Sequence, residues 1–343
     1  MRKVLIHRPG GYDHLSLESC DKPVPGPTEV RVRTSAIGVN FADCIVRMGL
    51  YSSARKYVGW PITPGFEFAG VVDLAGSSVR DLKPGDPVFG IVRFGAYATH
   101  VLAPRDQLFR IPDHLTNVQA ACFSVVFLSA WYALFELASA KPGMNILVHS
   151  AAGGVGGALL QLGKLAGCRM VGVVGNVSKS ETARSLGADE VIVKTNEDLW
   201  RGARCHAPEG YDIVLDANGP STLSRSYDHV APSGRLVVYG FHSMLAQSDG
   251  RPRWGHLAVD YLRTPRFNPL DLTNDNKSIM AFNLSYLFDK KALLGRALEQ
   301  LLGWLQEGRI VSPPIRTYPL AEVQEAQRAL ESGKTVGKLA LVP

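Results

Sequence analysis

Short apolar runs alternate with amphipathic helical stretches from about residue 143 onward. The runs predict strands at residues 146–149, 170–174, 191–193, 213–216, 236–239 and 279–283. Strands that are apolar along their whole length are typical of a parallel sheet, because helices bury both of its faces. The pattern therefore predicts a doubly wound α/β domain in this part of the chain.

The C-terminal part of the chain predicts one helix and one further strand. Apolar residues between Leu293 and Leu305 follow helical spacing, and Gly308 stands where such a helix would end. Residues 338–342 predict the last strand. Residues 241–278 show no clear periodicity, and a loop of this length in a compact domain is either a functional flap or partly mobile.

The first third of the chain is rich in glycine, proline and short β-branched runs. Residues 30–33 and 68–72 predict strands, while segments such as 23–27 and 83–86 carry the Pro, Gly and Asp residues that reverse a chain. This texture predicts a small strand-rich domain.

Residues 120–135 carry no charged side chain, and a run of about 18 such residues would suggest a membrane-spanning helix. However, Ser129 dilutes the run and Glu136 ends it, and Thr116 and Gln119 have the spacing of a helix capping box. We therefore expect a buried helical stretch and no integral membrane segment.

The length and composition of the chain indicate a two-domain globular protein. Its 343 residues suit two domains of about 100 to 200 residues each. The formal net charge of +6 is not concentrated in a Lys/Arg run, so nucleic-acid binding is not expected. The 5 cysteines form no C-x-x-C pair and the N-terminal residues lack the apolar stretch of a signal peptide, so we expect a cytoplasmic location.

A glycine turn joins the predicted strand 146–149 to a helix, since residues 151–156 read Ala-Ala-Gly-Gly-Val-Gly before apolar residues at helical spacing. Gly153 lets the backbone approach a pyrophosphate, Gly156 lets the helix pack close to the strand, and the helix N-terminus offers N–H groups to phosphate oxygens. The sequence therefore predicts a dinucleotide phosphate site, made of Gly153, Gly154, Val155 and Gly156.

The residue that selects the cofactor is expected at the end of the second strand, about 20 residues after the glycines. NAD-dependent sites carry a carboxylate there, but this chain has Gly175 and Asn176. Asn176 and Ser178 offer hydrogen-bond donors and Lys179 offers a positive charge, which together suit a 2′-phosphate. NADPH is the predicted cofactor.

The chain resembles the quinone oxidoreductase branch of the medium-chain dehydrogenase/reductases from end to end. Within that branch, residues 10–13 (Gly-Gly-Tyr-Asp), 40–43 (Asn-Phe-Ala-Asp), 49–51 (Gly-Leu-Tyr), 151–156 and 282–287 are most similar to the vesicle amine transport protein-like group.

The resemblance implies a GroES-like catalytic domain at residues 1–122 and 285–343, and a Rossmann NADP(H)-binding domain at residues 123–284. It also implies that further residues line the cofactor, namely Asn218, Gly240, Phe241, Phe282 and Asn283. Lys194 replaces a tyrosine that the family often places beside the adenosine ribose, which adds positive charge there.

Zinc-dependent members of the superfamily hold their catalytic zinc with a Cys, a His and a second Cys or Asp. By motif, these positions fall on Asn40, on Phe66 and near Val125, and Phe and Val cannot bind zinc. The residue that relays the alcohol proton falls on Ala42. The resemblance thus implies a zinc-independent enzyme, for which the oxidation of a simple alcohol is difficult.

A quinone or conjugated enone spreads the charge that hydride addition creates, so it needs only a few hydrogen-bond donors. Asn40 and Tyr51 are the candidates to bind that oxygen, with Ser129 on the nicotinamide side. Either Tyr51 or water would deliver the proton, and a packing role is the alternative for Tyr51. Asp43 and Glu67 are predicted to be structural.

These residues predict an NADPH:quinone oxidoreductase-type medium-chain reductase. Two alternatives stay open: a reductase of conjugated enals or enones, and a nucleotide-binding protein of the same fold with little turnover. The expected partner is a small quinone or conjugated carbonyl. The resemblance also implies a homodimer, in which the strand at residues 279–283 pairs with its twin.

Overall fold

The computed structural model describes residues 1–244 and 250–343. The chain divides into two compact units. The described residues of unit 1 are 1–126, 250–252 and 284–343, and those of unit 2 are 127–244 and 253–283.

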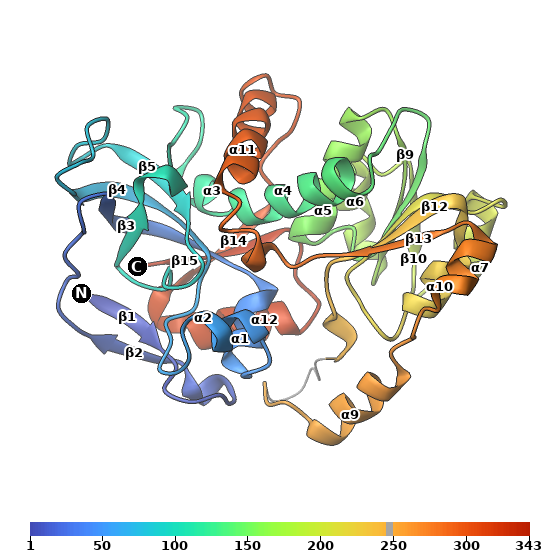
Figure 1. The fold of residues 1–343 in the computed structure, drawn as a ribbon, viewed down its shortest axis with the longest axis horizontal. Coiled ribbons are helices and arrows are strands. Elements are labelled where there is room, and N and C mark those ends of the chain that lie inside the picture. Colours follow the sequence, from blue (N-terminus) through green and yellow to red (C-terminus); the bar gives the residue numbers. More distant parts are fainter. Residues whose placement is uncertain (245–249) are drawn as a thin grey trace. The chain divides into compact units, whose positions relative to one another are not determined.

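Unit 1 is built on a seven-stranded sheet with the order β14-β15-β3-β4-β5-β7, to which β6 is added by pairing with β3 (Figure 1). Its pairs are antiparallel, except for β14 with β15. The strands are β3 (Glu29–Val39), β4 (Glu67–Ala75), β5 (Pro87–Ile91), β6 (His100–Pro104), β7 (Leu108–Arg110), β14 (Ile315–Pro319) and β15 (Lys338–Val342). A separate antiparallel pair is formed by β1 (Arg2–Leu5) and β2 (Ser16–Ser19). The predicted strand-rich domain and its last strand are confirmed.

Unit 1 also contains helices, some of which pack on this sheet. They are α1 (Phe41–Arg47), α2 (Ser52–Tyr57), α3 (Asn117–Ala121), α11 (Lys291–Gln306) and α12 (Val323–Glu331). Helix α3 lies against β3 and β4, and α12 lies against α1, β14 and β15. The helix predicted from the leucine spacing is α11, and Gly308 follows its end with a left-handed φ of 69°.

Unit 2 contains a six-stranded parallel sheet with the order β10-β9-β8-β11-β12-β13. The strands are β8 (Asn145–Val148), β9 (Arg169–Val174), β10 (Glu190–Val193), β11 (Tyr211–Asp216), β12 (Val230–Val238) and β13 (Ser278–Ala281). The chain runs outward from β8 to one edge and then returns to build the other side. Because such crossovers are right-handed, the helices must cover both faces of the sheet. The predicted doubly wound sheet is confirmed.

One strand of unit 2 begins earlier than the sequence predicted. Strand β12 starts at Val230 rather than at residue 236, and its first part contains Pro232 and Gly234, which read as a turn. Ser233 has a φ of 67°, and the register between β11 and β12 shifts at Tyr211. The strand therefore passes through an irregularity that turn residues accommodate.

Four helices of the described residues follow strands of the parallel sheet, and the core of unit 2 lies between these helices and the strands. They are α5 (Gly154–Leu165), α6 (Ser180–Ser185), α7 (Leu199–His206) and α8 (Leu223–Asp228). Strand residues such as Leu147, Ile192 and Val214 pack with Trp200 of α7 in one buried cluster.

The uncharged segment at residues 120–135 is helical, as predicted. Thr116 Oγ1 accepts a hydrogen bond from Gln119 N at 3.3 Å, and Gln119 Oε1 accepts one from Thr116 N at 2.9 Å, which completes the capping box of α3. Helix α4 (Ser124–Trp131) follows and continues as a π-helical segment, Tyr132–Leu137. Among residues 1–244 and 250–343, no helix is long and apolar enough to cross a membrane.

The prediction of a loop without regular structure at residues 241–278 was wrong. The segment contains α9 (Trp254–Arg263) and α10 (Pro269–Asp275), drawn in orange in Figure 1; residues 245–249 lie outside the described residues. Neither helix buries a residue, and Trp254, Leu257 and Tyr261 of α9 follow a helical spacing that the sequence prediction missed. The ends of α10 did carry signals, because Asn268 caps Leu270 N at 3.1 Å and Asn276 adopts a left-handed φ of 53°.

Candidate cofactor and substrate sites

The glycine turn at the end of β8 leads directly into α5, with Gly153 as the N-cap. A Cβ on Gly156 would lie 2.2 Å from the Ser150 carbonyl oxygen, so only glycine lets α5 start this close to the strand. A Cβ on Gly153 would meet only that oxygen, at 3.2 Å, so packing within the unit does not by itself require a glycine there. The first N–H groups of α5 have no partner within the helix and form a ready anion site.

The cofactor-selecting position lies in a short turn after β9. Asn176 caps the turn Val177–Lys179, and its Oδ1 accepts a hydrogen bond from Ser178 Oγ at 2.6 Å. Lys179 is only 8% exposed, and burial, with the nearby charge of Lys194, lowers its pKa. Lys194 follows β10 and donates its backbone N–H to Val174 O at 3.0 Å, so both lysines lie at the same edge of the sheet.

A buried carboxylate organises the turn that follows β11. Asp216 is 0% exposed, and its Oδ1 accepts from Asn218 N at 2.7 Å and from Gly219 N at 3.2 Å. Its Oδ2 accepts from Thr222 Oγ1 and from Ser226 Oγ, both at 2.7 Å. Asp216 therefore fixes the backbone at Asn218, one of the residues expected to line the cofactor.

The same turn is tied to the glycine turn and to the segment after β12. Ser150 Oγ donates to Asn218 Oδ1 at 3.3 Å. A Cβ on Gly219 would lie 2.7 Å from the ring of Phe241, and one on Gly240 would lie 2.7 Å from Ala217 O. Because Gly219 and Gly240 lack a Cβ, the two turns can approach this closely, and Phe241 remains 42% exposed beside them.

The remaining cofactor-lining candidates of unit 2 lie after β13, and Ser129 lies in α4. The ring of Phe282 packs against that of Tyr132 with centroids 5.0 Å apart, and Phe282 N donates to Val238 O at 3.2 Å. Asn283 follows it and is partly exposed. Ser129 is buried, with 8% exposure.

In unit 1, Asn40 is part of a buried network of polar side chains. It precedes α1, is 8% exposed, and donates from Nδ2 to Glu67 Oε1 at 3.0 Å. Its Oδ1 accepts from Lys338 Nζ at 2.7 Å, and Lys338 also lies 2.7 Å from Glu67 Oε1. Lys338 was not among the residues predicted from the sequence, although a lysine at the start of an apolar strand was a possible signal.

Tyr51 belongs to an aromatic cluster that consists of Tyr51, Phe66 and Phe94. The ring of Tyr51 is 5.9 Å from that of Phe66 and 6.4 Å from that of Phe94, both edge-on, and Phe66 is 5.3 Å from Phe94. Phe66 immediately precedes Glu67, so the aromatic cluster and the network around Asn40 meet at the start of β4. A cluster of this kind suits a flat conjugated ring.

Asp43 anchors the backbone under this region. Its carboxylate accepts from Asn40 N at 2.8 Å, from Gly65 N at 2.9 Å and from Tyr97 OH at 2.9 Å. Burial raises the pKa of Asp43 to about 7, and hydrogen bonds from Asn40 and Tyr97 oppose that rise. Asp43 therefore connects α1 to the chain that leads into β4, and it makes the structural contacts that the sequence predicted for it.

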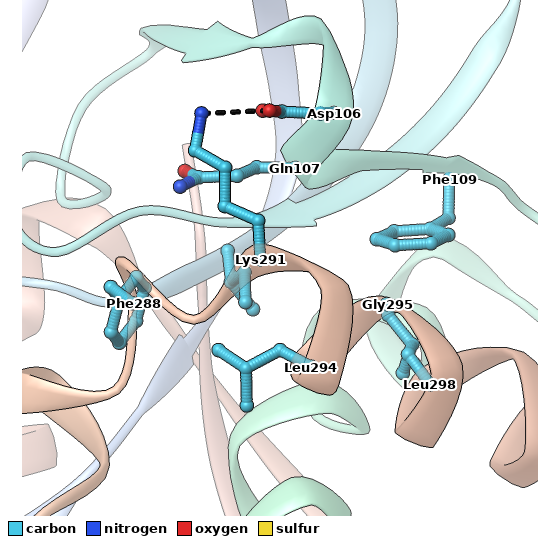
Figure 2. A pocket seen from close by; sticks show the side chains of 9 residues that line it. Asp106, Gln107, Phe109, Phe288, Lys291, Leu294, Gly295 and Leu298 are labelled. Atoms are coloured by element: carbon cyan, nitrogen blue, oxygen red, sulfur yellow. Dashed lines mark hydrogen bonds and ion pairs between the residues drawn. The ribbon is translucent and has the colours of Figure 1, made fainter.

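A small cavity elsewhere in unit 1 is not a candidate site. Figure 2 shows it between α11, which contributes Lys291, Leu294 and Leu298, and the chain that carries Asp106 and Phe109. Its volume is about 10 Å³, which leaves room for about one water molecule. Lys291 and Asp106 form an exposed ion pair at 2.7 Å across it.

The residues at the positions of the zinc ligands do not fit a metal ion. Asn40 has its side-chain oxygen bound to the Lys338 ammonium, and the side chain of Phe66 offers no ligand atom. The ammonium group of Lys338 already binds the side-chain oxygens of Asn40 and Glu67, and its positive charge would repel a divalent cation there. Within the part of the chain that the structure describes, no group of three or more His, Cys, Asp or Glu side chains could hold a metal.

Together, these features describe an oxidoreductase with a strand-rich domain and a dinucleotide-binding domain. Two family models match the chain: "Alcohol dehydrogenase GroES-like domain" over residues 26–113 and "Zinc-binding dehydrogenase" over residues 186–341.

Similar proteins cover the whole chain. The synaptic vesicle membrane protein VAT-1 homolog of Rattus norvegicus is 34% identical over 100% of this chain and 84% of its own length. The 2-haloacrylate reductase of a Burkholderia species is 30% identical over 99% of this chain and 98% of its own. The crystal structure of Escherichia coli quinone oxidoreductase complexed with NADPH matches with 28% identity and a TM-score of 0.87, over 100% of both chains. The chain therefore belongs to the medium-chain dehydrogenase/reductase superfamily, in the group of the VAT-1 homologues.

Proposed function

We propose that this chain is an NADPH-dependent, zinc-independent reductase that transfers hydride to a quinone. Two features of the described residues support the proposal. Unit 2 has a glycine turn with a cationic, carboxylate-free turn after β9, and unit 1 has the donors Asn40 and Tyr51 beside an aromatic cluster.

The residues of unit 2 fit NADPH. The N–H groups at Gly154, Val155 and Gly156 would hold the pyrophosphate, because they begin α5 at the end of β8. A second group would hold the 2′-phosphate, namely Asn176, Ser178, Lys179 and Lys194. Bound NADPH supplies a hydride from its nicotinamide ring.

In unit 1, the chemistry required of the protein is to stabilise the oxygen that gains charge. Asn40 and Tyr51 each carry a donor suited to that oxygen. The rings of Phe66 and Phe94 offer apolar surface to a flat substrate, and they exclude water that would weaken the hydrogen bonds.

The direct test is NADPH consumption by the purified protein with a panel of benzoquinones and naphthoquinones, in the presence of a strong zinc chelator. We expect turnover with at least one quinone at a rate that the chelator does not change. Loss of activity in the chelator, together with one zinc per chain by metal analysis, would contradict the zinc-independent mechanism.

A second candidate acceptor is a conjugated carbonyl compound. The similarity to a 2-haloacrylate reductase over nearly the whole chain favours it, since a haloacrylate also accepts hydride into a conjugated system. Adding haloacrylates, enals and enones to the same panel separates the candidates by kcat/KM. If NADPH binds and no acceptor on the panel is reduced, the chain is a nucleotide-binding protein with little turnover.

A further inference from the structure

Lys338 is the first residue of β15, and its ammonium group is buried, with 4% of the residue exposed. Nζ lies 2.8 Å from Val39 O, 2.7 Å from Asn40 Oδ1 and 2.7 Å from Glu67 Oε1. An ammonium group has three N–H donors, and these three acceptors use all of them. Its position is therefore fixed by β3, by the residue before α1 and by β4.

Glu67 compensates the charge of Lys338. It is 1% exposed, its Oε1 accepts from Lys338 and Asn40, and its Oε2 accepts from Val125 N at 2.8 Å. A buried ion pair with its remaining lone pairs hydrogen-bonded avoids the cost of an isolated buried charge. The pair is therefore a stable feature against which Asn40 is held.

These two charges allow only one orientation of the Asn40 amide. Its oxygen faces the Lys338 ammonium and its nitrogen faces the Glu67 carboxylate, whereas a flipped amide would point N–H groups at the ammonium. One N–H of Nδ2 is used by Glu67. The other N–H has no partner among the described residues, and Asn40 retains 8% exposure.

An ammonium bound to an amide oxygen draws electron density from the amide nitrogen and makes the N–H groups stronger donors. We propose that Lys338 is a positioning residue that, with Glu67, orients and polarises Asn40, so that the second N–H donates to the substrate oxygen that gains charge. This inference rests on the proposed function. It places an ammonium group, acting through an amide, in the role that a metal ion plays in zinc-dependent relatives.

The first test uses a variant that removes both charges together, Lys338→Met with Glu67→Gln. The glutamine amide is uncharged, and its oxygen can still accept from Val125 N, while its nitrogen can pair with Asn40 Oδ1 once the Asn40 amide flips. We expect kcat to fall tenfold or more, while the KM for NADPH changes less than twofold, because the cofactor candidates lie in unit 2.

A purely structural role is separated by repeating the change in an Asn40→Ala background. If Lys338 acts through Asn40, the paired change lowers kcat no further in that background. An equal fall in kcat with and without Asn40 would overturn the proposal.

The conservative variant Lys338→Arg keeps the charge and is the second variant if the pair does not fold. We expect its kcat to stay within about tenfold of the wild type and Lys338→Gln to fall well below it, at similar thermal midpoints. Equal kcat values for the two variants would overturn the proposal.

A readout that needs no turnover is the NMR signal of the Asn40 side-chain amide in protein labelled with ¹⁵N-asparagine, assigned by its absence in Asn40→Ala. We expect its protons downfield in the wild type relative to the paired variant. An unshifted amide in a chain that reduces quinones would overturn this inference alone. A shifted amide in a chain that reduces no acceptor would instead overturn the proposed function.

Discussion

The charge states of single residues in the candidate sites depend on their burial and on neighbouring charges. Lys179 is buried, and both this burial and the charge of Lys194 lower its pKa. A lysine held this way favours an anion that would neutralise it. We propose that Asn176, in the same turn, decides whether that anion is tolerated.

Asn176→Asp is expected to erase or invert the preference for NADPH. A carboxylate at this position would face the 2′-phosphate and repel it, while it could bind the ribose hydroxyls of NADH. Titrations with both nucleotides should show that the wild type binds NADPH at least tenfold more tightly, from about 1.4 kcal/mol or more of charge-assisted contacts. Asn117→Asp, at an exposed position at the start of α3, adds the same charge and should leave the ratio unchanged. Equal affinities in the wild type would contradict the prediction.

Tyr51→Phe is expected to lower kcat/KM for the quinone about tenfold, because it removes one donor to the developing oxyanion worth about 1.5 kcal/mol. The ring keeps its edge-on contacts in the aromatic cluster. Tyr57→Phe, at the other end of α2, is the matched control and should turn over at the wild-type rate. A parental rate for Tyr51→Phe would show that this tyrosine only packs.

At the scale of elements, the position of α5 against β8 depends on the glycine turn. Gly156 has no room for a Cβ beside Ser150 O, whereas Gly153 has room apart from a contact at 3.2 Å. The two glycines therefore serve different purposes. Gly156 is needed for packing of the helix, and Gly153 leaves its surroundings open for a ligand.

Gly156→Ala should shift the N-terminus of α5 away from the turn, since a contact of 2.2 Å to a backbone oxygen cannot be relieved by a side chain. We expect a loss of roughly 1 to 3 kcal/mol in the free energy of unfolding and at least tenfold weaker NADPH binding. Gly153→Ala should lose NADPH binding with little loss of stability. Urea unfolding and NADPH titration of both variants check this, and matching behaviour of the two would contradict the assignment.

The pH dependence of stability belongs to the whole molecule. Burial lowers the pKa of His149, and it lowers the pKa of His242 to about 4, so both are neutral in the folded chain. The contribution of His242 is complete above the unfolded value of about 6.5 and is lost as the pH falls from there toward 4, and that of His149 is lost in the same direction. Asp43 acts in the opposite sense. Its pKa is raised on folding, so its contribution to stability is present at low pH and is lost as the pH rises toward about 7.

His242→Gln should therefore reduce the loss of stability on acidification. Relative to the variant, the wild type should lose up to about 2 kcal/mol of unfolding free energy between pH 7 and pH 5, from one proton over about 1.5 pH units. Urea unfolding at the two pH values measures this. The exposed His114→Gln should follow the wild type, and a His242→Gln curve parallel to both would refute the assignment.

The sheet of unit 2 ends at β13, which leaves that strand at an edge. Phe282 N bonds back to β12, so by alternation the N–H of Ala281 points to the open side. We predict a homodimer paired through this edge, and Ala281→Pro should make it monomeric by removing an outward donor. Light scattering of this variant and of Ala281→Ser measures the outcome. A wild-type monomer at all concentrations would contradict the prediction.

The sequence by itself determined the parallel sheet, its glycine turn and the helix at residues 291–306. The reason is that hydrophobic periodicity and glycine spacing are local properties, and the strands of unit 2 are apolar on both faces. The same reasoning missed α9 and α10. Trp254, Leu257 and Tyr261 of α9 do follow helical spacing, but the segment lacks the repeated apolar runs of the core elements, and in the structure neither helix buries a residue.

Only the tertiary structure decided which polar residues meet. Lys338 and Asn40 are 298 residues apart along the chain, and pairing of β15 with β3 brings them to 2.7 Å. The burial of Lys179 and the four hydrogen bonds to Asp216 likewise depend on packing. Such contacts arise from long-range strand pairing and desolvation, which have no period in the sequence.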